Sequence, residues 1–192
     1  MARYDGEHKE QTRRRILETA GRRLKSDGID GSGVKTLMAD AGLTNGAFYA
    51  HFASKDDLVA ATVADQLRAQ TEVLRSLPPG ADSVRTYLGS YLSATHRDDP
   101  ASGCPSGALL DEIARSSPAV QAAYTAGLVQ MADAMGELLP GLGRVAALQV
   151  LATLVGTLQL ARSLDDPALS AAVLDGALAT LTAQLAPAED TP

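Results

Sequence analysis

Apolar residues recur at helical spacing along most of this chain, and that pattern constrains its fold more than any other feature. Ala and Leu dominate, Trp is absent, and no β-branched run alternates with polar residues as a strand would. Pro and Gly interrupt the pattern at Leu77–Gly80 and at Pro140–Gly141. The sequence therefore predicts an all-α protein of about nine helices. We expect them near residues 7–27, 32–41, 44–51, 54–77, 82–96, 106–114, 117–139, 143–164 and 167–185.

Short polar residues stand at the expected starts of five of these helices. A Ser, Thr or Asp side chain at such a position can accept a hydrogen bond from a backbone N–H of the first turn. Pro follows two of the five residues at the first helical position, where its missing N–H costs nothing. The predicted N-caps are Ser32, Thr44, Ser54, Ser117 and Asp166.

Charge is distributed unevenly along the 192 residues. The whole chain carries a formal net charge of −6, which by itself argues against a nucleic-acid partner. Residues 1–55, however, hold ten Lys and Arg against seven Asp and Glu, a balance of +3, whereas the rest holds seven against sixteen, a balance of −9. The asymmetry suggests a basic end that docks on phosphates and an acidic body, although an Arg-rich first helix is also a common solvated face.

Two short predicted helices are joined by the tight segment Ala41–Leu43. Such a pair with a Gly in the turn makes a helix-turn-helix, whose second helix can enter a DNA major groove, although an ordinary helical corner looks similar. Three of the seven aromatic residues cluster here. Phe48 and Phe52 share a face at i, i+4 spacing and are expected to anchor the second helix, which leaves Tyr49 pointing elsewhere.

The outward residues of that second helix are small or polar, as close approach to a duplex requires. Asn45 could read a base edge by paired hydrogen bonds, and adenine suits it best. Phosphates on either side of the groove could be contacted by donors. The candidates for those phosphate contacts are Lys35, Tyr49, His51 and Lys55.

The stretch Gly42–Lys55, which includes Tyr49-Ala50-His51-Phe52 followed by Ser54-Lys55, resembles the signature of the tetracycline-repressor (TetR) family of transcriptional regulators. The resemblance covers about residues 12–58. It implies a three-helix DNA-binding domain over residues 1–55 and a helical ligand-binding and dimerisation domain over 56–192. It also implies a homodimer that represses transcription and leaves its DNA operator when a small molecule binds. The family's recognition contacts fall on Thr44, Asn45, Gly46, Ala47 and Tyr49, and its backbone contacts on Lys35, His51 and Lys55.

The C-terminal part contains a stretch of seventeen residues without a charge, Val145–Ala161. A membrane span needs about 20 apolar residues, and Gln and Thr interrupt this stretch, so we expect a helix buried on two sides and no membrane partner. The final helix carries only Asp175 as a charge. Helices 143–164 and 167–185 are therefore expected to form a four-helix interface between two copies, with a purely intramolecular core as the alternative.

Several Tyr, Met and Leu side chains in the middle helices could line a pocket for an apolar effector that accepts an occasional hydrogen bond. The alternative is that each is ordinary core. The helix at 54–77 joins the basic end to these helices, so a ligand could act through it. The candidates for effector contacts are Tyr87, Leu88, Tyr91, Tyr124, Met131 and Met135.

Cys104 is the only cysteine, so an intrachain disulfide is excluded and a reducing cytoplasm is expected. The segment Arg97–Pro105, with Gly-Cys-Pro before a short helix, resembles one found in a TetR subgroup. Some regulators of that subgroup are thought to respond to electrophiles or oxidants through such a cysteine. A helix N-terminus facing Cys104 would lower its thiol pKa, whereas the alternative is a buried structural cysteine.

Other function classes find little support in the sequence. His96, Cys104 and Asp111 could be arranged as a catalytic set, but no motif surrounds them, and we expect no enzyme. With three His and no phosphate-binding Gly loop, no metal and no cofactor are expected. The polar N-terminal segment makes secretion unexpected. A helical adaptor without DNA fits the composition but leaves Tyr49–Phe52 unexplained.

Overall fold

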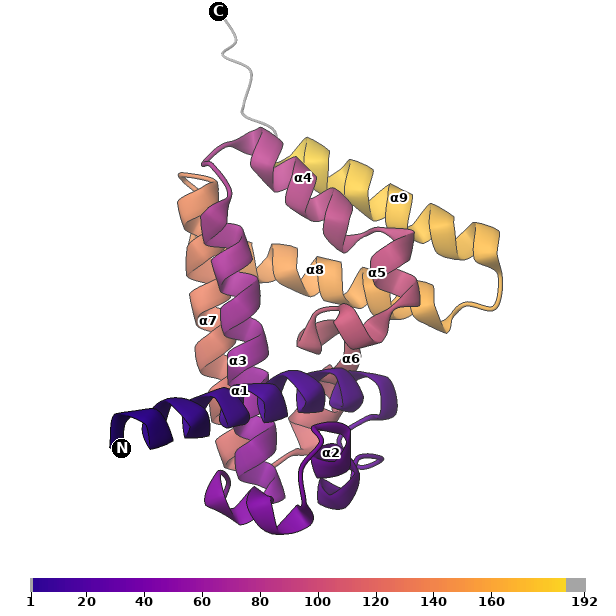
Figure 1. Ribbon diagram of the computed structural model, residues 1–192. Coiled ribbons are helices and arrows are strands. Elements are labelled where there is room, and N and C mark those ends of the chain that lie inside the picture. Colours follow the sequence, from indigo (N-terminus) through magenta and orange to yellow (C-terminus); the bar gives the residue numbers. More distant parts are fainter. Residues whose placement is uncertain (1, 186–192) are drawn as a thin grey trace, which may run out of the picture. The chain divides into compact units, whose positions relative to one another are not determined.

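The computed structural model describes the backbone of residues 2–185 and the side chains of residues 6–185. Over that range it contains nine α-helices, two short 3₁₀ helices and no strand, which confirms the all-helical prediction (Figure 1). The chain forms two compact units. Unit 1 comprises the residues up to 67 together with 101–127, and unit 2 comprises 68–100 together with those from 128 onward.

Unit 1 is built around the N-terminal helices, and its core holds Phe48 and Phe52 at 1% and 2% exposure. Ile16 and Leu17 from the first helix and Leu37 and Met38 from the second pack in the same cluster. The elements of this unit are α1 (Ala2–Asp27), α2 (Val34–Asp40), the 3₁₀ helix η1 (Asn45–Ala50), the first part of α3 (Lys55–Ser76), α6 (Pro105–Arg115) and the start of α7 (Pro118–Leu138).

Unit 2 is organised around the hairpin of the last two helices, with α4 lying beside α9 (Figure 1). Ser170 donates a hydrogen bond of 2.7 Å to the carbonyl of Ala161 and so ties the hairpin together. Arg162 donates to the carbonyls of His96 and Arg97 and holds α5 against α8. The elements that begin in this unit are α4 (Ala81–Tyr91), α5 (Ala94–Asp98), the 3₁₀ turn η2 (Pro100–Ser102), α8 (Arg144–Ser163) and α9 (Pro167–Gln184).

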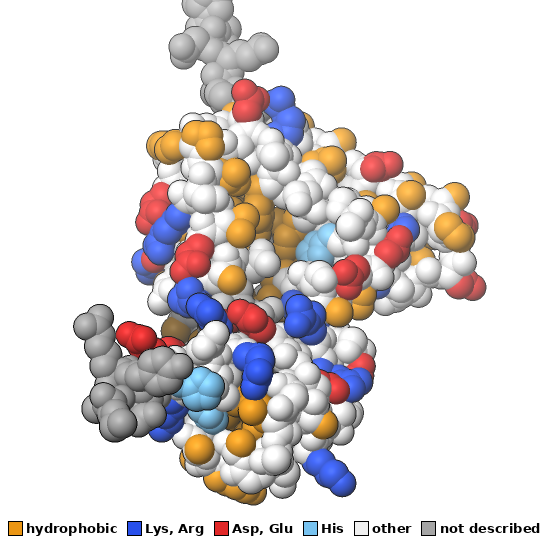
Figure 2. Space-filling model, viewed as in Figure 1, with side chains coloured by type: hydrophobic (Ala, Val, Ile, Leu, Met, Phe, Trp, Pro, Cys, Tyr) orange, Lys and Arg blue, Asp and Glu red, His pale blue; other side chains and the backbone are white. Residues whose placement is uncertain are grey.

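Within the single chain, α8 is buried along one side and not along the two sides that we expected. Its buried residues recur at helical spacing, as in Val150, Leu154 and Leu158, because that side packs on the rest of unit 2. The opposite side is exposed and apolar, with Val145 at 71% and Leu160 at 54% exposure. Figure 2 likewise shows apolar side chains on the surface along α9.

Two of the five predicted N-caps form as expected, and three do not. Ser54 accepts from the N–H of Asp57, and Asp166 accepts from the N–H groups of Ala168 and Leu169. Ser32 fails as a cap because its hydroxyl donates to the carbonyl of Gly28 at 2.8 Å, and Gly33 takes the N-cap position instead. Thr44 and Ser117 precede their helices as predicted, but neither Oγ1 of Thr44 nor Oγ of Ser117 makes a capping hydrogen bond.

Two helix predictions also need correction. The helix expected over 82–96 is broken into α4 and α5, because Ser93 caps a new helix by accepting from the N–H of His96 at 3.1 Å. The helix expected over 44–51 is the 3₁₀ helix η1. In addition, α1 begins at Ala2, five residues before the predicted start.

Candidate DNA-binding site

A tight turn joins α2 to η1. The N–H of Gly42 donates to the carbonyl of Ala39, and the N–H of Leu43 donates to that of Met38, both at 2.9 Å. Gly42 has φ +67, the left-handed conformation that this pair of hydrogen bonds requires and that Gly adopts without strain. The sequence Ala41–Leu43 thus ends α2 sharply and sets the direction in which η1 leaves.

Aromatic side chains anchor the inner face of η1, as the i, i+4 spacing predicted. The rings of Phe48 and Phe52 lie 5.8 Å apart between their centroids, inside the unit 1 core. The guanidinium of Arg13 lies 4.4 Å above the ring of Phe52 and donates to the carbonyl of His51 at 2.8 Å. Sequence reasoning missed this role of Arg13, although its position one turn from Leu17 on α1 signals a side chain at the edge of the core.

The outer face of η1 and the residue before it carry four of the five predicted recognition contacts. Thr44, Asn45, Gly46 and Tyr49 are exposed, Tyr49 at 73%, whereas Ala47 is half-buried and packs against the unit 1 core. At Gly46 a Cβ would meet nothing closer than 4.0 Å, so no packing inside the protein requires Gly there. Helix–helix packing against this position is therefore not the reason for a Gly here.

The predicted phosphate-contact residues flank that face. Lys35 is exposed near the start of α2, and Lys55 is half-buried at the first position of α3. A reciprocal cap fixes the start of α3, because the carboxylate of Asp57 also accepts from the N–H of Ala53 at 3.0 Å. The first turn of α3, which carries Lys55, is therefore fixed by two hydrogen bonds between side chains and the backbone.

His51 closes η1 and is half-buried. Burial lowers the pKa of its imidazole, and the nearby charges of Lys9 and Arg13 lower it further. Both effects favour the neutral imidazole, in which one ring nitrogen donates and the other accepts a hydrogen bond. Its Nδ1 is buried without a hydrogen-bond partner among the described residues.

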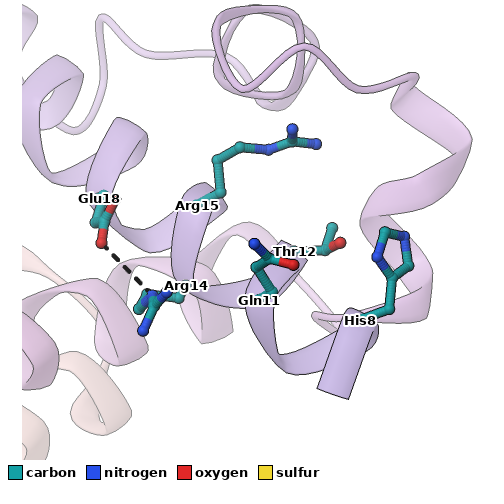
Figure 3. Close-up of a pocket in the computed structure, with 6 residues that line it drawn as sticks. All are labelled: His8, Gln11, Thr12, Arg14, Arg15 and Glu18. Atoms are coloured by element: carbon teal, nitrogen blue, oxygen red, sulfur yellow. Dashed lines mark ion pairs between the residues drawn. The ribbon is translucent and has the colours of Figure 1, made fainter. Parts of the chain in front are cut away.

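The outer side of α1 carries a shallow hollow of about 330 Å³. Arg14 and Glu18 form an ion pair of 3.8 Å there, with both side chains largely exposed, and Figure 3 shows Arg15 pointing away from it. Exposed pairs of this kind contribute little to stability. Two Arg and one Glu on this side are exposed to solvent, as expected for an Arg-rich solvated face. The lining residues are His8, Gln11, Thr12, Arg14, Arg15 and Glu18.

The candidate effector residues are divided between the two units. Tyr87, Leu88 and Tyr91 lie on the buried side of α4, and Met131 and Met135 lie on that of α7, all in unit 2. The rings of Tyr87 and Tyr91 are 6.2 Å apart. The imidazole of His96 stands edge-on to Tyr91 at 4.6 Å, with its Nδ1 2.7 Å from the Tyr91 carbonyl oxygen. The sequence suggests His96 only as a member of a catalytic set, and its five-residue spacing from Tyr91 does not predict this ring contact.

Cys104 and Tyr124 lie in unit 1 instead. Cys104 is 3% exposed and occupies the N-cap position of α6. The hydroxyl of Tyr124 donates to Oγ of Ser106 at 3.0 Å, and burial raises the pKa of this phenol. Asp111, the third member of the catalytic set, instead pairs with Arg115 on the exposed side of α6.

Across residues 6–185 no three His, Cys, Asp or Glu side chains are grouped so that they could hold a metal ion. Helix α8 is long and apolar enough to cross a membrane, with a mean hydropathy of 1.4 over its best window. The core helix of a soluble protein passes the same test, so this is weak support for a membrane span.

The two short helices α2 and η1 meet in a fixed turn. Buried aromatic rings anchor their inner side, and the outer side of η1 is exposed and polar. This arrangement is a helix-turn-helix. Residues 16–62 match the family model of bacterial regulatory proteins, tetR family. This match covers the helix-turn-helix part of the chain and agrees with the resemblance of Gly42–Lys55 to the TetR signature.

Solved structures of TetR-family proteins share the fold over nearly the whole chain. The reduced form of NemR from Escherichia coli is 22% identical, with a TM-score of 0.74 over 89% of this chain and 95% of that one. A TetR-family regulator from Agrobacterium tumefaciens is 20% identical, with a TM-score of 0.71 over 92% and 98%. One from Legionella pneumophila is 19% identical, with a TM-score of 0.72 over 88% and 94%. No curated protein sequence matches the chain.

Proposed function

We propose that this protein is a homodimeric, cytoplasmic repressor that binds a palindromic DNA operator and leaves it when a small molecule binds. The observation that carries the proposal is the exposed polar face of η1, which is held above a buried aromatic core. Basic residues lie on the helices before and after η1, Lys35 exposed on α2 and Lys55 half-buried at the start of α3. This arrangement presents hydrogen-bonding groups to base edges and cations to the flanking phosphates.

Each residue of the site has a proposed role. Asn45 reads a base edge, and Thr44 and Tyr49 contact bases or the adjacent backbone from the exposed side of η1. Gly46 and Ala47 let the backbone approach the groove closely. Lys35, His51 and Lys55 bind phosphates, His51 as a neutral donor. Residues 1–55 then act as the DNA-binding part, and residues 56–192 as the regulatory part.

The exposed sides of α8 and α9 support dimerisation through these two helices. On α8 the exposed side includes Val145, Ala152, Gly156 and Leu160, with no charge between Arg144 and Arg162. On α9 small residues line the exposed side, and Asp175 is the one charge between its ends. Such faces bury well against a second copy. A twofold dimer would set two recognition helices about 34 Å apart, one turn of DNA.

The effector is proposed to act among the middle helices of unit 2. The aromatic and Met side chains there suit an apolar ligand with one or two polar groups. The α3 helix contributes residues to both units, so a shift of α3 would change the distance between the two recognition helices of a dimer. The residues proposed to contact the effector in unit 2 are Tyr87, Leu88, Tyr91, Met131 and Met135. Tyr124 lies in unit 1 and is a separate candidate.

A second candidate is a repressor that senses oxidants or electrophiles through Cys104. Its support is the position of Cys104 at the N-terminus of α6, and the structural likeness to NemR, which was solved in a reduced form. The burial of Cys104 is also what a structural cysteine would show. A Cys104→Ser protein that keeps a normal response to every inducer would leave only the small-molecule mechanism.

Footprinting on the DNA that flanks the protein's own gene tests the proposed function. A specific repressor should protect a short palindrome and should lose affinity steeply between 50 and about 200 mM salt. An adaptor without DNA-binding activity would protect no site at either salt concentration.

A further inference from the structure

The carboxylate of Glu112 on α6 is hydrogen-bonded to the turn between α1 and α2. Its Oε2 accepts from the backbone N–H of Ile29 at 2.7 Å and from that of Asp30 at 3.2 Å. These are the first two N–H groups after Gly28, where α1 ends. One charged side chain of α6 therefore fixes the segment that leads into the helix-turn-helix, by hydrogen bonds of the stronger, charge-assisted kind.

Gly28 is fitted to this contact. It has φ +80, and a Cβ at this position would lie 2.8 Å from Oε1 of Glu112. The left-handed turn and the missing side chain together let the carboxylate reach both N–H groups. The α1–α2 turn and α6 are thus shaped for each other.

A second contact joins α1 to the residues just before α6. Lys25 is only 7% exposed, and its Nζ donates to the carbonyl of Gly103 at 2.7 Å and to Oε1 of Gln66 on α3 at 2.8 Å. Gly21, one turn earlier on α1, makes room for Gln66, since a Cβ there would lie 2.7 Å from its Nε2. A Lys on the buried side of α1 is thereby retained by hydrogen bonds to two other segments.

A hollow of about 250 Å³ lies beside the Glu112 contact. Ile29, Asp30 and Glu112 border it, together with Lys55 and Val120. Beside this open space, the hydrogen bonds of Glu112 are polar links from α6 to the α1–α2 turn.

We propose that Lys25 and Glu112 are positioning residues that make α6 part of the DNA reader, so that a displacement of α6 reaches α2 and η1 through the α1–α2 turn. This rests on the proposed function and adds a second route beside the α3 lever. All of the contacts lie within unit 1, and none of the residues belongs to the proposed DNA-contacting set. Operator affinity should therefore depend on a carboxylate that never touches DNA.

The test compares Glu112→Met with Asp111→Asn in the full-length protein. Met keeps the length of the side chain but accepts no hydrogen bond from Ile29 or Asp30. Asp111 is the neighbouring, exposed carboxylate, so its Asn variant is the matched control for the lost negative charge. The DNA probe is the palindrome protected in the footprint.

We expect Glu112→Met to weaken operator binding about tenfold, within the usual range of couplings between sites, and Asp111→Asn to change it less than about twofold. Losing a negative charge near DNA would by itself strengthen binding, so a loss of affinity cannot come from the charge. Hydrogen exchange at the N–H groups of Ile29 and Asp30 should accelerate in Glu112→Met only. Glu112→Gln, which keeps one acceptor oxygen, should fall between the two.

Lys25→Met is the second variant and tests the other contact. It should also weaken operator binding, but with an unchanged salt dependence, because the buried Nζ neutralises no phosphate. Operator affinity at the wild-type level in both Met variants, or unchanged exchange at Ile29 and Asp30, would overturn the inference. Failure of the proposed function would show differently, as the absence of specific binding by the wild-type protein itself.

Discussion

The exposed side of η1 and the exposed sides of α8 and α9 are both uncovered surfaces, but they differ in every other respect. The first is short and polar and rests on two buried Phe rings. The second spans two long helices and shows small and apolar side chains such as Val145, Leu160 and Leu169. We propose that the two surfaces have different partners: a charged, hydrated duplex for η1, and a second copy of the same chain for α8 and α9.

The two surfaces also differ in how residues that stabilise the fold are placed relative to residues that would contact a partner. On η1 the two roles fall on adjacent residues, because a buried Phe48 is followed by an exposed Tyr49. On α8 and α9 they merge, since apolar residues that are exposed in one chain would become core in the dimer. Substitutions that distinguish these cases test the comparison directly.

Phe48→Ala should have the largest effect. Removing a fully buried aromatic side chain costs about 3–5 kcal/mol, so the free energy of unfolding should fall by that amount and operator binding should be lost with it. Tyr49→Ala is the adjacent control and should change stability by less than about 0.5 kcal/mol while weakening DNA binding. Urea unfolding of the two variants measures this, and equal destabilisation would contradict the assignment of faces.

Ala172→Glu places a charge on the exposed side of α9. If that side is buried in the dimer, the unpaired carboxylate should raise the dimer dissociation constant by about 100-fold or more. Ala69→Glu introduces the same side chain on an exposed position of α3 and should leave the dimer intact. Sedimentation across a concentration series gives both constants. A dimer unaffected by Ala172→Glu would place the interface elsewhere.

Asn45→Ala and Lys55→Ala should distinguish sequence-specific base recognition from binding to the phosphate backbone. Loss of a base contact costs about 1–3 kcal/mol on the preferred sequence and relaxes specificity at that position. Loss of a phosphate contact should weaken binding to all sequences alike and reduce the salt slope by about 1. Binding to operator variants at several salt concentrations distinguishes them. If Asn45→Ala weakened all sequences equally, Asn45 would be a backbone contact.

The smallest effect is expected at Asp133, which pairs with Arg144 at 2.7 Å in unit 2. The hydrogen bond from Arg144 lowers the pKa of this carboxyl below its ordinary value. A carboxyl whose pKa is lower in the folded state stabilises the fold at pH values above its unfolded pKa of about 3.9. This stabilisation is lost as the pH falls through the folded-state pKa. The small stability difference between wild type and Asp133→Asn should therefore be present at pH 7 and shrink below about pH 4. A pH-independent difference would exclude this ion pair as its source.

Much of the fold could be predicted from the sequence, because helical periodicity and Pro and Gly breaks are local signals. The match of residues 16–62 to the TetR-family model could also be predicted, since Tyr49–Phe52 and Ser54-Lys55 form a nearly continuous local motif. The break between α4 and α5 was missed because Ser93 caps α5 without interrupting the apolar spacing of Val84–Leu92. The 3₁₀ form of η1 was missed because, over only six residues, the sequence pattern does not distinguish 3.0 from 3.6 residues per turn.

The contacts that tie α6 to α1 could not be predicted. Glu112 meets Ile29 across 83 positions and Lys25 meets Gly103 across 78. Nothing local marks either pair, apart from a Lys on the buried side of α1. The candidate effector residues show the same limit, since one sequence pattern of Tyr and Met was divided by the fold between two units.

The mass of the protein–operator complex tests the central claim most directly, that η1 reads DNA only when α8 and α9 hold two copies together. We predict two chains on one palindrome for the wild-type protein, and no stable complex at the same concentration for Ala172→Glu, whose η1 is unchanged. A single chain bound to the palindrome, with equal affinity in both proteins, would contradict the account.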